Sequence, residues 1–217
     1  MREVAMFPLG SVLFPHTPLL VRIFEPRYLT MLGRLLDEVD PRFGVVLIER
    51  GREVGGGDVR TGIGTFARLI RVEAANEAMY AVAVGGGRFE VAEWLDDDPH
   101  PRARVTGVPE LEWDDALTAL RREAEAIVRR VVARASDAAS DSLEAVRWDA
   151  ATPLSDDPVE AAWQLAALAP LGELDRQLLL RSTTMGGLLR AIIDLTLDIE
   201  PVITARPADD GGYSAAG

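Results

Sequence analysis

The sequence predicts an α+β protein in which a β-rich N-terminal half with one helix precedes a helical C-terminal half. Short β-branched runs separated by glycine and proline fill residues 1–112, and apolar residues recur every three or four positions from residue 114 onward. The 217 residues are 48% hydrophobic and 27% charged, which is ordinary for a globular protein. We expect a β-rich unit over 1–112, a helical unit over 113–204 with a loop at about 136–156, and a disordered tail over 205–217.

The strands of the first half are predicted from apolar runs between turn-forming residues. EVAMFPL and LLVRIF are separated by GSVLFPHTP, whose glycine and two prolines favour a loop. FGVVLIE is a continuous apolar run typical of a buried strand. Four more strands are predicted from IGTFARLIRVEA, MYAVAVGG, RFEVAEWL and RARVTGV, with DDDPHP as a turn and RGREVGGGDVRTG as a flexible loop.

One helix is predicted in the β-rich half, beginning at Pro26. Proline suits a first helical position because its missing N–H has no intrahelical partner there anyway. The apolar residues that follow at helical spacing are Tyr28, Leu29, Leu32, Leu35, Leu36 and Val39.

The helices of the second half are predicted to begin at aspartates. Asp114 can cap an apolar stripe that starts just after it. Asp157 is followed by Pro158 and, three positions after the aspartate, by Glu160, which is a helix-start signature. The predicted helices cover 158–169, 172–182 and 185–199, the last ended by Pro201.

The composition excludes several classes of function. The chain has no cysteine, and all 23 of its basic residues are arginine, which excludes thiolate chemistry, Schiff bases and a phosphate-loop lysine. The net charge of −12 opposes binding to phosphate backbones. No apolar run approaches the roughly 18 residues of a membrane span, and no signal peptide is apparent, so we expect a cytoplasmic protein without membrane partners.

The residues that could carry catalysis or bind a metal lack the necessary context. His16 and His100 stand beside prolines, where we expect exposed turns, and no serine lies in a G-x-S-x-G motif. The acidic run 96–98 lacks the spacing of a calcium loop. The glycine triplets at 55–57 and 85–87 precede no helix, so they indicate loops or bulges. We expect no catalytic residue, no metal site and no cofactor.

Nucleic-acid binding is an alternative that the sequence leaves open. Arg68, Arg71, Arg88 and Phe89 on neighbouring strands could line a binding face. Strand alternation, however, predicts that Arg68 and Arg71 face opposite sides. An RNA- or nucleotide-binding protein would show an affinity that falls steeply with salt, and the acidic charge argues against it.

A series of sequence blocks resembles a known family. FPLGSVLFP, PLLVRIFEPRYLTML, FGVVLIERG, GTFARLIRV and GGRFEVAEWLDDDPHPRARVTGVPE follow one another over residues 5–112 in the order and spacing of the Lon N-terminal, substrate-binding domain family. DPVEAAWQLAALAPLGELDRQLLL and LLRAIIDLTLDIE are similar to that family's C-terminal bundle. The resemblance implies a PUA-like, partly closed β-barrel with one helix, followed by an α-helical bundle. One departure is FPH where the family has FPG, so the turn at His16 is expected to differ in shape.

The resemblance also implies a function. It predicts a stand-alone, non-enzymatic module without the ATPase and protease domains of Lon. This module is expected to bind unfolded or degron-bearing client polypeptides. It could act as an adaptor or holdase in protein quality control, linked to an ATP-dependent protease. We expect the polypeptide-binding surface near Phe14, Phe24 and Tyr28, with contributions from Phe66 and Phe89. The loop at 51–61 could act as a lid.

The remaining residues that match the family pattern are expected to be structural. They are Pro8, Leu9, Pro15, Glu25, Arg27, Gly44, Gly64, Thr65 and Arg88. Glu25 stands at the predicted helix start, where the helix dipole favours a carboxylate. Arg27 or Arg88 could pair with Glu25 and hold the helix against the barrel.

Overall fold

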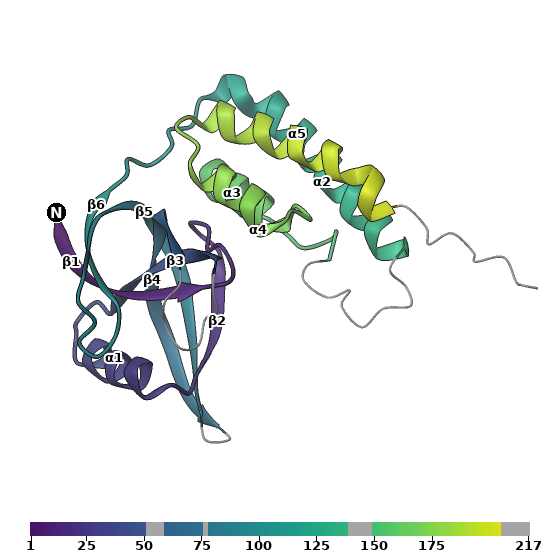
Figure 1. Cartoon of the computed structure of the whole chain (residues 1–217). Helices are drawn as coiled ribbons and strands as arrows, with labels where there is room; N and C mark the ends of the chain where they lie inside the picture. Colours follow the sequence, from purple (N-terminus) through teal and green to yellow (C-terminus); the bar gives the residue numbers. More distant parts are fainter. Residues whose placement is uncertain (51–58, 76–77, 139–148, 205–217) are drawn as a thin grey trace, which may run out of the picture.

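The computed structural model describes residues 1–50, 59–75, 78–138 and 149–204, and its described strands form a single mixed sheet (Figure 1). The strands are β1 (Arg2–Leu9), β2 (Pro18–Ile23), β3 (Arg42–Arg50), β4 (Val59–Ala75), β5 (Ala78–Leu95) and β6 (Arg102–Gly107). Their order is β2-β5-β4-β3-β1-β6, and β6 also pairs with β5. β1 and β3 are parallel, and the other pairs are antiparallel. This is the partly closed β-barrel of the predicted α+β fold.

The barrel closes at one level and stays open at the other because β5 is long. The second half of β5 pairs with β6, which in turn pairs with residues 2–5 of β1. The first half of β5 pairs instead with β2. Among the described strands, β2 pairs with β5, and residues 6–9 of β1 pair with β3. β1 and β2 therefore do not pair with each other, and a seam separates them.

Of the two structures predicted for the second glycine triplet, the loop is wrong because β5 runs through it, and the bulge is confirmed by the register shift against β4 between Thr65 and Ala67. MYAVAVGG and RFEVAEWL belong to one 18-residue strand. At Gly85 an added Cβ would overlap the main-chain carbonyl oxygen of Phe14, where the chain between β1 and β2 crosses the sheet. This glycine therefore serves close backbone approach and not a turn.

Strand alternation is also interrupted on β4, between two of the predicted arginines. The pairing register between β4 and β5 shifts between Leu69 and Arg71. Arg68 and Arg71 are in consequence both exposed, and the prediction that they face opposite sides is wrong.

The helix of the β-rich half, α1 (Pro26–Leu36), begins at the predicted proline. Its buried face consists of Tyr28, Met31, Leu32 and Leu35. Glu25 occupies the N-cap position but its side chain makes no capping hydrogen bond. The predicted apolar face is only partly right: Leu29 and Leu36 are exposed, and Val39 lies beyond the helix end.

The helical half consists of a short 3₁₀ turn, η1 (Asp115–Leu117), and helices α2 (Thr118–Ala138), α3 (Pro158–Leu168), α4 (Glu173–Leu180) and α5 (Met185–Thr204). Both predicted caps are confirmed: Asp114 accepts from the Ala116 N–H, and Asp157 accepts from two N–H groups of α3. The predicted end at Pro201 is wrong, since α5 continues through it to Thr204. α2 and α5 lie side by side, with α3 and α4 nearer the barrel (Figure 1).

Within the described part of the chain, three clusters of buried apolar side chains form the core. One lies between α1 and the barrel and includes Phe7, Val21 and Tyr28. A second fills the barrel around Met6 and Phe89. The third is formed by the helices together with two barrel-side residues, Phe14 and Ile63. The rings of Phe14 and Trp163 stack at 5.7 Å in this third cluster.

Arg88 of β5 ties the helical half to the barrel. Its guanidinium donates to the carbonyl oxygens of Leu180 at 2.8 Å, Ser182 at 2.6 Å and Pro109 at 3.0 Å. It lies 5.2 Å from the centre of the Trp163 ring. Arg88 is 4% exposed, and burial lowers the pKa of its guanidinium. Because its donors are occupied here, Arg88 does not pair with Glu25, and it is also withdrawn from any nucleic-acid surface formed by Arg68.

Candidate functional site

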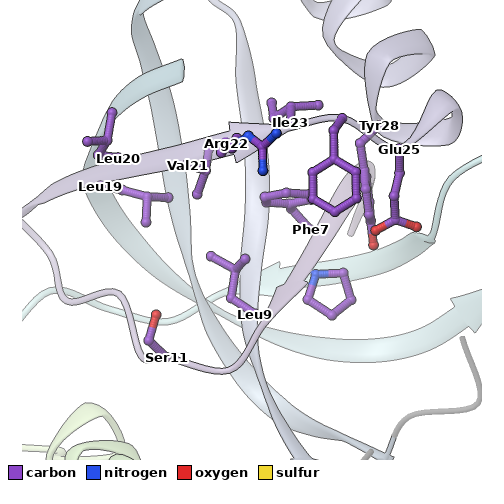
Figure 2. Close-up of a pocket in the computed structure, with 12 residues that line it drawn as sticks. Phe7, Leu9, Ser11, Leu19, Leu20, Val21, Arg22, Ile23, Glu25 and Tyr28 are labelled. Carbon is purple, nitrogen blue, oxygen red and sulfur yellow. The ribbon is translucent and has the colours of Figure 1, made fainter. Parts of the chain in front are cut away.

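A groove of about 350 Å³ occupies the seam between β1 and β2 (Figure 2). It is lined by residues 7–9, 11, 19–25 and 28, from both strands and the first turn of α1. Its volume falls within the usual range of binding pockets, about 300–1,000 Å³. The groove exists because β1 and β2, its two walls, are not hydrogen-bonded to each other. The space between the two strands is lined by their side chains.

The floor of the groove is apolar and its rim exposes two large apolar side chains. Phe7, Val21 and Tyr28 form the floor as members of the core cluster under α1, and the rings of Phe7 and Tyr28 meet edge to face at 4.3 Å. At the rim, Leu20 is 69% exposed and Phe24 is 48% exposed. Figure 2 shows the β1 and β2 side chains on both sides of this space.

An ion pair lies at the α1 end of the groove. Arg27 approaches one carboxylate oxygen of Glu25 with Nη2 at 3.0 Å and with Nε at 3.1 Å. The same guanidinium lies 4.7 Å from the ring centre of Tyr28. The predicted Glu25–Arg27 pair is confirmed, and it holds the start of α1 beside the floor of the groove.

The five aromatic residues predicted to bind polypeptide are divided among separate places. Phe24 and Tyr28 lie together in the groove. Phe14 is 1% exposed and packs in the helical core, while Phe66 and Phe89 pair at 4.7 Å inside the barrel. These three have almost no surface to offer a partner. Of the predicted lid, residues 51–58 lie outside the described residues, and residues 59–61 belong to β4 and not to a loop.

Sequence reasoning missed two residues of the groove rim, Leu20 and Arg22. Both are exposed, and together with Phe24, which directly follows β2, they occupy every second position. The pattern PLLVRIF contains this signal, because every second residue from Leu20 onward points away from the core.

Several residues of the family pattern lie at close backbone contacts. An added Cβ at Gly44 would meet the Met6 side chain and the Phe89 ring, and at Gly64 it would overlap the Val45 carbonyl oxygen. The hydroxyl of Thr65 donates to the Leu13 carbonyl oxygen at 2.6 Å. Pro8 and Leu9 line the groove from β1, and Pro15 is buried.

The prediction that both histidines lie in exposed turns is wrong. His100 is 3% exposed, and its Nδ1 lies 3.1 Å from the Pro101 carbonyl oxygen. It is buried because its segment folds back on β1, where the Met6 N–H donates to the same carbonyl at 2.8 Å. His16 is half-buried, 3.4 Å from the Glu160 carboxylate. Its φ of 58° is the left-handed conformation that glycine adopts readily, so histidine here keeps a backbone shape suited to glycine.

The described residues contain no group of three histidine, aspartate or glutamate side chains placed to hold a metal ion. Nor does any helix within those ranges have the length and apolarity to cross a membrane.

Comparison with known proteins gives one family. Residues 3–197 match the model of the ATP-dependent protease La (LON) substrate-binding domain. The chain is 30% identical over 112 residues to Lon protease 2 of Sorangium cellulosum (strain So ce56), a match covering 50% of this chain and 14% of that protein.

Two solved structures share the fold. The Lon N-terminal domain protein from Xanthomonas campestris has a TM-score of 0.58 at 22% identity, covering 95% of this chain and 100% of that chain. The N-terminal domain of Mycobacterium avium complex Lon protease has a TM-score of 0.65 at 18% identity, covering 91% and 99%, respectively.

Proposed function

The chain belongs to the substrate-binding domain family of the ATP-dependent protease La (Lon), and from this membership we propose that it captures unfolded or degron-bearing polypeptide in the groove between β1 and β2. The module acts by binding and not by catalysis. It serves as an adaptor or holdase that presents its client to an ATP-dependent protease.

The observation that carries this proposal is a groove with an apolar floor and two large exposed apolar side chains at its rim. Unfolded chains differ from folded ones in exposing large apolar side chains, and a concave apolar surface is the complementary shape. Phe24 offers an aromatic contact at the rim, and Phe7 and Tyr28 offer a firm floor because they are held by the core beneath. Buried aromatic contacts of this kind contribute most of the energy at protein interfaces.

The test is fluorescence anisotropy with three labelled probes: an unfolded apolar-rich peptide, a scrambled polar peptide and a structured RNA. Each is titrated at low and moderate salt. Capture of the apolar peptide should depend little on salt, because burial of apolar surface dominates. RNA binding that falls steeply with salt would instead favour the nucleic-acid alternative.

The matched variants are Phe24→Ser in the groove and Leu178→Ser on α4. The two side chains are similarly exposed, at 48% and 56%. We expect Phe24→Ser to weaken peptide binding about tenfold, the effect of losing a moderate hot spot, and Leu178→Ser to leave it unchanged. Equal effects of both variants, or no binding of the apolar peptide at all, would contradict the proposal.

A further inference from the structure

We propose that the client segment binds as an additional β-strand on the free edge of β2, filling the seam between β2 and β1. This inference rests on the proposed function of the same groove and specifies the bound conformation and the class of segment selected. It requires a free strand edge with unpaired backbone groups, a second wall that does not compete for them, and side chains suited to an alternating partner.

Among the described strands β2 pairs only with β5, which leaves the backbone groups of Leu20 and Arg22 on its outer edge without a strand partner. Next to β2, Gly85 of β5 bonds toward this side of the sheet, accepting from His16 N–H and donating to the Thr17 carbonyl oxygen. Backbone N–H and C=O groups alternate between the two sides of a strand, so every second residue before Gly85 also directs these groups toward β2. These residues are Ala83, Ala81 and Met79. Their partners on β2, which therefore make the hydrogen bonds to β5, are Leu19, Val21 and Ile23.

The alternate residues of β2 must then point their N–H and C=O groups away from β5. Pro18, which has no N–H, falls on this edge, where proline is tolerated in a sheet. Leu20 and Arg22 follow in the same phase, and each offers one donor and one acceptor to an added strand.

The opposite wall of the seam is blunted, which leaves β2 as the pairing edge. The Met6 N–H points away from β3 to the Pro101 carbonyl oxygen, so two residues further along β1 the nitrogen of Pro8, which lacks a hydrogen, also lies on the side facing the seam. At these two positions β1 has no N–H to give, while its side chains still line the groove.

The side chains of β2 impose an alternating pattern on the added strand. Val21 is 8% exposed and faces the core, while Leu20 is 69% exposed and faces outward. Client residues on the inner face would meet Val21 and the β1 side chains Phe7 and Leu9 in the groove, which requires apolar residues. The residues between them lie on the outer face and can be polar.

Charge complementarity selects one of these outer residues. Within the described residues Arg22 forms no ion pair, and its guanidinium lies 5.3 Å from the ring centre of Phe24. Glu25 next to it is already engaged by Arg27. Opposite charges directly across two strands stabilise the pair. The occupant is therefore an extended segment with apolar residues at every second position and an acidic residue across from Arg22.

The decisive probe is a labelled nine-residue peptide that alternates valine and threonine, with one central aspartate in place of a threonine. It is compared with two copies in which the amides of one or the other alternate set are N-methylated. Strand addition predicts that one set weakens binding about tenfold, through loss of hydrogen bonds, while the other set changes it less than about twofold. Equal effects of the two sets would overturn strand addition.

The protein-side variants are Leu20→Pro and Leu20→Ala. Leu20→Pro removes the free N–H without removing a bond to β5, whereas Leu20→Ala removes the side chain and keeps the N–H. We expect Leu20→Pro to weaken binding of the unmethylated peptide about tenfold more than Leu20→Ala does. Circular dichroism confirms that each variant is folded, and equal binding by the two folded variants would overturn the proposal.

The charge is tested by exchange at Arg22. Arg22→Glu should weaken binding of the aspartate peptide and strengthen binding of a copy with lysine at that position, each severalfold. An unchanged preference would overturn the acidic specificity. If the unfolded apolar peptide binds but N-methylation shows no alternation, the proposed function stands and strand addition fails; if neither peptide binds, both fail.

Discussion

Replacement of Arg88 by methionine should destabilise the protein by detaching the helical half from the barrel. Methionine keeps an unbranched side chain of similar reach but removes the guanidinium. The three carbonyl oxygens of Leu180, Ser182 and Pro109 then lose their donor.

The magnitude follows from the burial of these acceptors. The bond to Leu180 is buried, and a buried hydrogen bond to a charged group contributes about 1.5–3 kcal/mol. Water can reach the other two acceptors, so we assign each about 0.5–1 kcal/mol. Release of the buried guanidinium from its desolvation offsets part of this sum. We expect a net loss of about 2–3 kcal/mol, which lowers the melting temperature by about 5–10 °C for a chain of this size.

The assay is urea unfolding followed by circular dichroism, with Arg68→Met as the matched control. Arg68 is an exposed arginine on the neighbouring strand β4, and its replacement should change the free energy of unfolding by less than about 0.5 kcal/mol. If Arg88→Met unfolds at the same urea concentration as Arg68→Met, the carbonyl contacts of Arg88 do not stabilise the junction and the reasoning is refuted.

Two further predictions concern β5 and the helical half. Gly85→Ala should cost about 3 kcal/mol or more, because its Cβ would overlap the Phe14 carbonyl oxygen, whereas Gly87→Ala has open space and should be close to neutral; urea midpoints of the two variants compare them directly. Burial acts to raise the pKa of Glu200, but hydrogen bonds from Arg134 and Arg130 outweigh it and hold the pKa below the ordinary 4.5. A lowered carboxyl pKa stabilises the folded state above pH 4.5 and ceases to do so as the pH falls through the folded value. The stability difference between the wild type and Glu200→Gln should therefore be full at pH 7 and shrink as the pH falls below 4.5, and a difference that stays constant down the acid range would contradict this.

Local chemistry explains the elements that the sequence predicted well. Pro26 and Asp157 mark helix starts because their effects extend over a single turn, and the structure begins α1 and α3 at those points. The Glu25–Arg27 pair was also predictable, since its members are two residues apart.

The wrong predictions share a dependence on distant residues. Whether Gly85 ends a strand depends on the approach of Phe14, and whether His100 is exposed depends on where its segment meets β1. The sequence allowed a pair between Arg88 and Glu25. The observed partners of Arg88 include main-chain carbonyl groups near residue 180, and side-chain identity cannot reveal a main-chain partner.

The sequence by itself determined the α+β class, the helix starts and the membership of the Lon substrate-binding domain family. Only the tertiary structure decided where a groove lies, because a groove arises where two strands fail to pair, and pairing depends on the whole course of the chain. The pattern of β2 shows that Leu20 and Phe24 point outward. The pattern does not show that these two side chains face an open seam. The seam exists because β6 pairs with β1 only up to Ala5, and β2 does not pair with the residues 6–9 that follow.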